Sequence, residues 1–123
     1  MIKVAPSVLA ADFTALGEEA RRMAAAGADE LHVDIMDGTF VPNISFGACV
    51  VDALKKSCAL PLDVHMMVQD PVRYIPDMVR AGASRITVHV EATPHIHRAI
   101  QVIRDAGVEA GVALNPGSPA ELV

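Results

Sequence analysis

Three side chains that could bind a divalent metal ion stand at matching positions in two short β-rich segments. His32 and Asp34 are two residues apart in the first segment, and His65 occupies a similar place in the second. Residues two apart on a strand point to the same side, and neighbouring parallel strands lie about 4.8 Å apart. Two imidazoles and a carboxylate can therefore converge, as a site for Zn²⁺, Fe²⁺, Mn²⁺ or Co²⁺ requires. For either histidine alone, a hydrogen-bonded place in the core is the competing interpretation.

Four further side chains follow the same alternation and would face the same side of a sheet. Met36 and Met67 stand two residues beyond the carboxylate and the second imidazole. Methionine on a strand usually fills a core, but it could also form an uncharged wall over a metal. Ser7 is either a hydrogen-bonded core serine or a contact for a substrate hydroxyl. His89 is expected to be a structural core histidine.

A long loop follows the first of these segments. Asp37 and Gly38 end the segment, and residues Thr39–Gly47 carry two phenylalanines before the next helical pattern. This length and composition suit a flap over a substrate site, and an ordinary connector is equally consistent with them. The sequence contains neither a GxGxxG nor a Walker A motif, so it shows no recognisable phosphate loop.

Short β-rich runs alternate with helical runs, which is typical of an α/β fold with a parallel sheet. Periodicity predicts strands at Val4–Leu9, Leu31–Ile35, Leu62–Met67, Arg85–Val90 and Ala110–Leu114. It predicts helices at Phe13–Ala26, Gly47–Ser57, Val72–Ala81 and His95–Ala106, the third of which must accommodate Pro76. Three of these helices end at a glycine, the residue that most easily adopts the left-handed conformation after a helix.

Polar residues interrupt the predicted strands in one phase, and the alternate positions are apolar. One face of the sheet would therefore pack on helices while the other gathers polar groups. The interior of a TIM (β/α)8 barrel explains this better than an open sheet buried on both faces. Complete barrels have eight strands and about 250 residues. We therefore expect residues 1–123 to form a single partial domain, a barrel truncated to about five βα units.

Composition limits the classes of function that remain. Of the 123 residues, 52% are hydrophobic and the net charge is −5, so nucleic acid is not an expected partner. No apolar run approaches the about 20 residues of a membrane helix, and no signal peptide is recognisable. The two cysteines form no CxxC pair and are expected to be reduced. We expect a cytoplasmic protein that forms a homo-oligomer, because open strand edges need cover.

Several strings resemble the ribulose-phosphate 3-epimerase family, a family of ribulose-phosphate-binding barrels. The resemblance runs over essentially the whole sequence and is carried by Ala5–Phe13, His32–Gly38, Phe40–Asn43, Asp63–Val68 and Asn115–Pro116. It implies metal-dependent interconversion of D-ribulose 5-phosphate and D-xylulose 5-phosphate, with a small phosphosugar as the substrate.

The resemblance also implies roles for individual residues. His32, Asp34 and His65 match metal ligands of the family, and Asp34 also matches one of two acid/base carboxylates. Ser7 and His65 match substrate contacts, while Met36 and Met67 match methionines near the intermediate. In the implied reaction Asp34 removes the C3 proton to give an enediolate, and a second aspartate protonates the opposite face.

The second aspartate, which is also the fourth metal ligand, and the glycine-rich phosphate loops have no match in these 123 residues. On their own, the residues are therefore expected to bind metal weakly and not to epimerise. Two alternatives stay open. One is a 3-epimerase for another ketose phosphate, such as allulose 6-phosphate. The other is a non-catalytic half-barrel that associates with itself.

Overall fold

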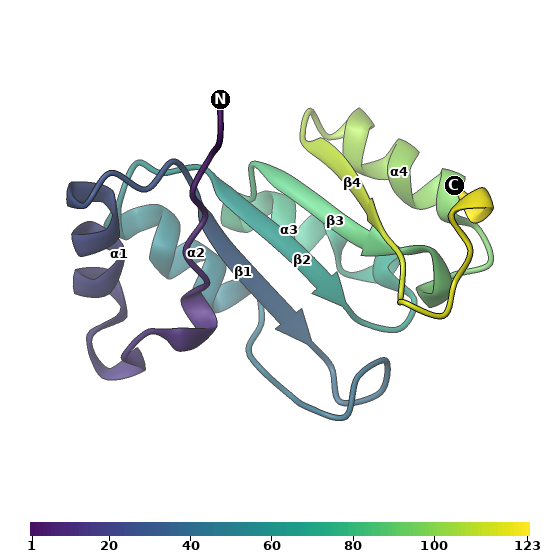
Figure 1. Ribbon diagram of the computed structural model, residues 1–123, viewed down its shortest axis with the longest axis horizontal. Helices are drawn as coiled ribbons and strands as arrows, with labels where there is room; N and C mark the ends of the chain where they lie inside the picture. Colours follow the sequence, from purple (N-terminus) through teal and green to yellow (C-terminus); the bar gives the residue numbers. More distant parts are fainter.

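A four-stranded parallel sheet runs through the chain, and its strands pair in the order in which they occur. The computed structural model describes residues 1–123. The strands, in the order β1-β2-β3-β4 across the sheet, are Leu31–Met36, Leu62–Met67, Arg85–His89 and Glu109–Ala113. A helix precedes each strand, so every connection crosses over one face of the sheet (Figure 1). The α/β fold with a parallel sheet is confirmed.

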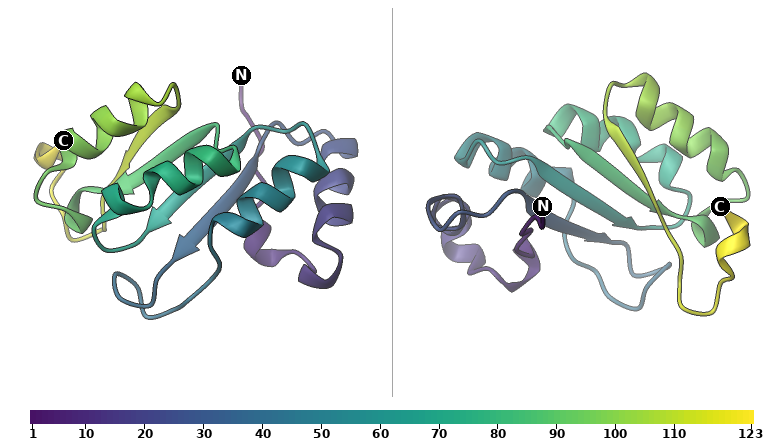
Figure 2. Two further views of the ribbon diagram at one scale, coloured as in Figure 1. Left: turned by 180° about the vertical axis from the view of Figure 1, so that it is seen from behind. Right: turned by 45° about the horizontal axis from the view of Figure 1, so that its top comes forward.

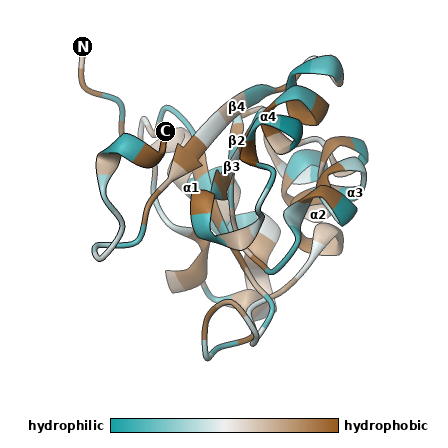
Figure 3. Ribbon diagram, turned by 90° about the vertical axis from the view of Figure 1, so that its right-hand side faces the viewer, coloured by the Kyte–Doolittle hydropathy of each residue, from teal (hydrophilic) through white to brown (hydrophobic).

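The helices cover one face of the sheet and leave the other open, as the view from behind in Figure 2 makes clear. These helices are α1, α2, α3 and α4, at Leu16–Ala25, Ala48–Ser57, Ile75–Ala81 and Ile96–Asp105. Each mixes hydrophilic and hydrophobic residues along its length (Figure 3), as an amphipathic covering helix requires. None of them has the length and apolar character needed to cross a membrane.

The core lies between these helices and the covered face of the sheet. Leu31, Val33 and Ile35 of β1 are at most 4% exposed, and the alternate residues of β2 are equally buried. The residues between them are only partly buried on both strands. The predicted alternation of an apolar helix-facing side and a polar side is therefore confirmed on β1 and β2.

The predicted first strand, Val4–Leu9, is wrong, and the sheet has four strands rather than five. This segment lies beside β1 and makes only isolated contacts with it, including one parallel bridge between Ser7 and His32. Pro6 has no amide proton to donate, although its carbonyl accepts from the His32 N–H at 2.9 Å. The Ser7 hydroxyl then accepts from the Leu9 N–H, which turns the chain into a 3-10 helix at Val8–Ala10.

The predicted helices are present, with ends that differ for local reasons. Asp12 caps a 3-10 turn at Phe13–Ala15, and α1 begins only after it. Likewise α3 is shorter than predicted, because Pro76 is accommodated in the first turn of the helix, where an amide proton is not needed. Gly82 follows α3 with φ of 103° and so supplies the left-handed residue that was predicted there.

Candidate metal centre on the open face of the sheet

The register of β1 and β2 places the three predicted ligands side by side. Asp34 lies directly opposite His65, and His32 lies opposite Asp63. All four side chains point to the open face, because their neighbours in sequence point to the core. One ligand atom from each of His32, Asp34 and His65 lies within 4.8 Å of the others, an arrangement that could hold a metal ion.

Asp34 is the shared member of this group. Its Oδ1 lies 3.0 Å from Nε2 of His32 and 3.2 Å from Nδ1 of His65. The same carboxylate oxygen therefore faces a nitrogen of each imidazole. In the metal-free chain a proton on one of these nitrogens can bridge such a pair, and a cation can replace that proton. The donor set fits a divalent ion such as Zn²⁺, Fe²⁺, Mn²⁺ or Co²⁺.

A second carboxylate orients His32. Nδ1 of His32 lies 2.8 Å from Oδ2 of Asp63, so the imidazole N–H donates to the carboxylate. This hydrogen bond is the main reason that the pKa of His32 lies above its usual value, although partial burial opposes it. The same bond holds the pKa of Asp63 below its usual value. With Nδ1 protonated, a neutral His32 directs its Nε2 lone pair at Asp34.

Asp63 in turn lies close to the positive charge of Arg85 on β3. Arg85 lies 3.6 Å from Oδ1 of Asp63 and also pairs with Glu30 at 3.1 Å and Glu109 at 3.2 Å. These carboxylates raise the pKa of Arg85, with the hydrogen bond to Glu109 the largest contribution. Oδ1 of Asp63 is buried and has no hydrogen-bond partner. The guanidinium thus supplies charge to Asp63 without a direct hydrogen bond to that oxygen.

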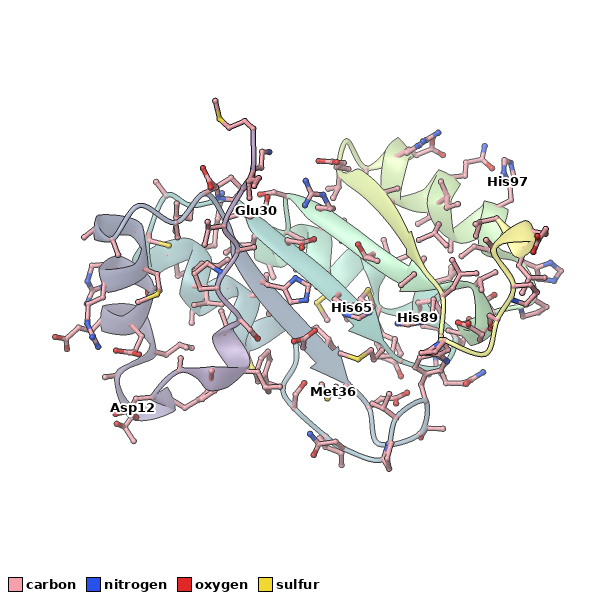
Figure 4. All side chains as sticks on the ribbon, viewed as in Figure 1. Asp12, Glu30, Met36, His65, His89 and His97 are labelled. Carbon is pink, nitrogen blue, oxygen red and sulfur yellow. The ribbon has the colours of Figure 1, made fainter.

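His65 is oriented by a histidine instead of a carboxylate. Its Nε2 lies 2.8 Å from Nε2 of His89, and Nδ1 of His89 lies 3.3 Å from Glu91. Burial is the main reason that the pKa of His65 lies below its usual value, and the neighbouring His89 lowers it further. The two imidazoles beside Asp34 therefore differ in the sign of their pKa shift. Figure 4 shows His65 and His89 close together near the arrowhead ends of the strands.

Besides His65, three residues were predicted on the substrate side of the site, and they lie on the same face. The Ser7 hydroxyl is 3.4 Å from Oδ2 of Asp34, to which it donates. Met36 and Met67 are paired across β1 and β2, one step beyond Asp34 and His65 toward the strand ends. The structure thus brings Ser7 to the carboxylate and places both methionines two residues beyond Asp34 and His65 on the same strands.

The first residues of the loop after β1 are held by hydrogen bonds and by a ring contact. Asp37 accepts hydrogen bonds from the backbone N–H groups of Thr39 and Phe40 at 2.8 Å, and of Gln69 at 2.7 Å. Burial disfavours the Asp37 charge, yet these hydrogen bonds outweigh it and lower its pKa. The Phe40 ring then packs on His89, with ring centroids 4.9 Å apart. The loop therefore reaches from the end of β1 to the end of β3.

Sequence reasoning missed three polar partners in the site. Asp63 stands in the polar phase of its strand but was assigned no role, and the signal for one was its place opposite His32 in a parallel pair. His89 is buried at 6% exposure, as predicted for a core histidine, but it also contacts His65. Glu91 follows β3 in a 3-10 turn, and no sequence pattern indicates its contact with His89.

A parallel α/β sheet with two imidazoles and a carboxylate side by side on its open face defines a class of candidate metal-dependent enzymes. Residues 3–123 match the Ribulose-phosphate 3 epimerase family. The chain belongs to that family, and the resemblance noted in the sequence is confirmed.

Relatives from bacteria and plants show the same similarity. The chain is 54% identical over 123 residues to Ribulose-phosphate 3-epimerase of Bacillus subtilis, covering all of this chain and 57% of that protein. It is 52% identical over 122 residues to the protein of the same name from Rhodobacter capsulatus, covering 99% of this chain and 54% of that one. A third relative is Ribulose-5-phosphate-3-epimerase, chloroplastic, of Arabidopsis thaliana, at 48% identity over 99% of this chain and 44% of its own length. The chain spans about half the length of the curated relatives it matches.

Proposed function

We propose that these residues form the metal-binding part of a ribulose-phosphate 3-epimerase, which interconverts D-ribulose 5-phosphate and D-xylulose 5-phosphate. The observation that carries the proposal is the position of Oδ1 of Asp34, at 3.0 Å from one imidazole nitrogen and 3.2 Å from another. Family membership supports the reaction, and the donor set supports one divalent ion, Zn²⁺, Fe²⁺, Mn²⁺ or Co²⁺.

In the proposed reaction Asp34 is the acid/base residue for one face of the sugar. Its carboxylate accepts the proton from C3 while the electron pair of that C–H bond moves toward the C2 carbonyl to give an enediolate. A bound divalent ion would supply the positive charge that makes this proton more acidic. The family resemblance implies a second acid/base carboxylate, which has no match in these 123 residues. In the proposed reaction that carboxylate returns a proton to C3 from the opposite face.

The remaining residues bind and shield the substrate in this proposal. Ser7 can turn its hydroxyl from Asp34 to a substrate oxygen, because its present contact is long at 3.4 Å. His65 contacts the substrate as well as the metal. Met36 and Met67 form an uncharged wall that keeps water away from the enediolate.

We further propose that residues 1–123 are one partial (β/α) barrel domain whose open face becomes the barrel interior. An open face with partly buried charged groups supports this, because such groups need partners. The proposed location is the cytoplasm, the proposed partner is a small phosphosugar, and the proposed assembly is a homo-oligomer. Neither nucleic acid nor a membrane is part of the proposal.

A chimera tests the reaction. In it, the 123 residues replace the matched 57% of the Bacillus subtilis relative, whose remaining residues are kept. We expect the chimera to interconvert the two pentose phosphates, to lose that activity in EDTA and to regain it with one of the four ions. A chimera that folds and binds metal but converts allulose 6-phosphate in preference would favour the other epimerase. A folded chimera without turnover on either substrate would contradict the proposal.

The 123 residues alone provide the complementary test. We expect weak metal binding and no epimerisation, because the second carboxylate is not among them. Turnover that EDTA abolishes would contradict this expectation. A defined oligomer by mass measurement, with no binding of any of the four ions, would favour the non-catalytic half-barrel.

A further inference from the structure

We propose that His89, held by Glu91, is a positioning residue that keeps the proton of His65 on Nε2 and directs its Nδ1 lone pair at Asp34. The inference rests on the proposed metal site and goes beyond it, because it assigns a role to residues outside the three ligands. It also determines which nitrogen of each imidazole is free to bind.

Three contacts in series carry this inference. Nδ1 of His65 lies 3.2 Å from Oδ1 of Asp34, and its Nε2 lies 2.8 Å from Nε2 of His89. On its other side, Nδ1 of His89 lies 3.3 Å from Oε2 of Glu91. Every ring nitrogen of the two histidines therefore has one polar neighbour.

With a cation on Nδ1 of His65, the nitrogen that faces Asp34, counting protons along the series leaves one neutral arrangement. Hydrogen bonds from Asn115 and Ser118 outweigh the effect of burial and hold the pKa of Glu91 at about 2, so this carboxylate only accepts. A neutral His89 must then carry its proton on Nδ1, which makes its Nε2 an acceptor. His65 must in turn donate from Nε2, which leaves its Nδ1 unprotonated.

The surroundings hold this arrangement in place. His89 is 6% exposed, and its ring packs on Phe40 at 4.9 Å and on His65 at 5.0 Å between centroids. Glu91 accepts from the Asn115 N–H at 2.7 Å through its second oxygen, so the turn after β4 fixes the carboxylate. Neither ring can rotate without losing both packing and a hydrogen bond.

The other imidazole is oriented in the opposite sense. Asp63 accepts from Nδ1 of His32, so His32 offers Nε2 to the site. His65 offers Nδ1. The outer partner of a metal-bound histidine sets its tautomer and raises its basicity. In this site a carboxylate does so directly for His32, whereas a neutral histidine transmits the effect of Glu91 to His65.

The first experiment measures the tautomer in the 123-residue chain saturated with Zn²⁺, by long-range proton–nitrogen correlation NMR. We expect the His65 ring to show a protonated Nε2 and an unprotonated Nδ1. In His89→Phe, which keeps an aromatic ring but removes the acceptor, we expect a mixture of the two tautomers. A zinc-bound wild-type chain with the His65 proton on Nδ1 would overturn the inference.

The second experiment measures metal affinity by competition of Co²⁺ with a coloured chelator, together with the visible absorption spectrum of the bound ion. We expect His89→Phe to weaken binding about tenfold or more, as loss of an outer partner usually does. His89→Gln should restore most of the affinity, because its amide oxygen can accept from Nε2. Glu91→Gln should weaken binding by less and acts away from the buried ring, so it remains informative if His89→Phe does not fold. His97→Gln, at an exposed histidine of α4, is the matched control and should leave the Co²⁺ affinity and the absorption spectrum unchanged.

These measurements separate the two proposals. A wild-type chain that binds no metal would contradict the metal site on which the inference rests, whereas a chain that binds Zn²⁺ with the His65 proton on Nδ1 would contradict the inference alone. Affinity that stays within twofold of wild type in both His89→Phe and Glu91→Gln would overturn the positioning role. A loss that His89→Gln fails to restore, with a Co²⁺ spectrum that has lost a nitrogen ligand, would make His89 a ligand and overturn it as well.

Discussion

The two faces of strands β1 and β2 differ in composition and burial, although their residues alternate along the same backbone. Leu31, Val33 and Leu62 point to the helices and are at most 1% exposed. His32 and Asp34 lie next to them in sequence, point to the open face and pair with polar side chains. The covered face buries the apolar core, and the open face holds the candidate metal site.

This difference predicts that the site can be changed without unfolding the chain. A strand has a period of two, so each face has its own set of neighbours. The polar set is stabilised by pairing among its members, and the apolar set by removal from water. A substitution on the covered face should therefore leave the metal affinity nearly unchanged, and one on the open face should leave the free energy of unfolding nearly unchanged. Four predictions test that separation.

Leu62→Ala should have the largest effect on the covered face. Leu62 is fully buried, and shortening such a residue leaves a cavity that costs about 2–5 kcal/mol in the free energy of unfolding. Urea denaturation measures the change, and Co²⁺ affinity of the folded fraction should stay near the wild-type value. Leu9→Ala, at a leucine that is 41% exposed, is the control. The separation fails if both substitutions cost the same.

Asp34→Asn should have the largest effect on the open face. Since its Oδ1 faces both imidazoles, we expect metal affinity to fall by about 100-fold or more, beyond what loss of an outer partner causes. The free energy of unfolding of the metal-free chain should change by less than about 1 kcal/mol. Chelator competition and urea denaturation measure the two quantities. The control is Asp52→Asn, at an exposed carboxylate paired with Lys56, which should alter neither the metal affinity nor the free energy of unfolding. Unchanged metal affinity in Asp34→Asn would show that Asp34 is not a ligand.

Asp63→Asn should have a smaller effect on the same face. The amide oxygen can still accept from Nδ1 of His32 but carries no charge, so we expect metal affinity to fall about tenfold. Glu109→Gln is the matched control, because Glu109 also pairs with Arg85 but does not contact His32. Equal losses in the two variants would assign the effect to Arg85 instead of His32.

The smallest effect is a difference in titration between the two imidazoles of the metal-free chain. We expect the pKa of His32 above 6.5, mainly through its bond to Asp63, and that of His65 below 6.5, mainly through burial. Proton NMR of the ring hydrogens during a pH titration measures both. Asp63→Asn should lower the first pKa and leave the second in place. The reverse order in the wild-type chain would contradict this account.

These shifts also give the sign of the pH dependence of stability. The raised pKa of His32 contributes stability that is present below pH 6.5 and is lost as the pH rises through its folded pKa. The lowered pKa of His65 contributes stability that is present above pH 6.5 and is lost as the pH falls through its folded pKa. In Asp63→Asn the first contribution shrinks, so the free energy of unfolding should fall less steeply as the pH rises above 6.5.

Much of the fold could be predicted because its signals are local. The β2 bounds Leu62–Met67 were predicted without error, and α2 at Ala48–Ser57 with an error of one residue. The prediction of a strand at Val4–Leu9 was wrong because apolar content does not reveal the 3-10 turn that the Ser7 hydroxyl caps. That His32 and Asp34 point to the same face of the sheet followed from the period of a strand alone.

The sequence by itself determined which residues share a face, because that depends only on the period of a strand. It also determined the family, through strings such as His32–Gly38. Only the tertiary structure decided that Asp34 meets His65, since register is a property of two strands brought together by a helix. It alone revealed that Asp63 and His89 orient the two imidazoles through opposite nitrogens, because those contacts join three strands and the turns beyond them.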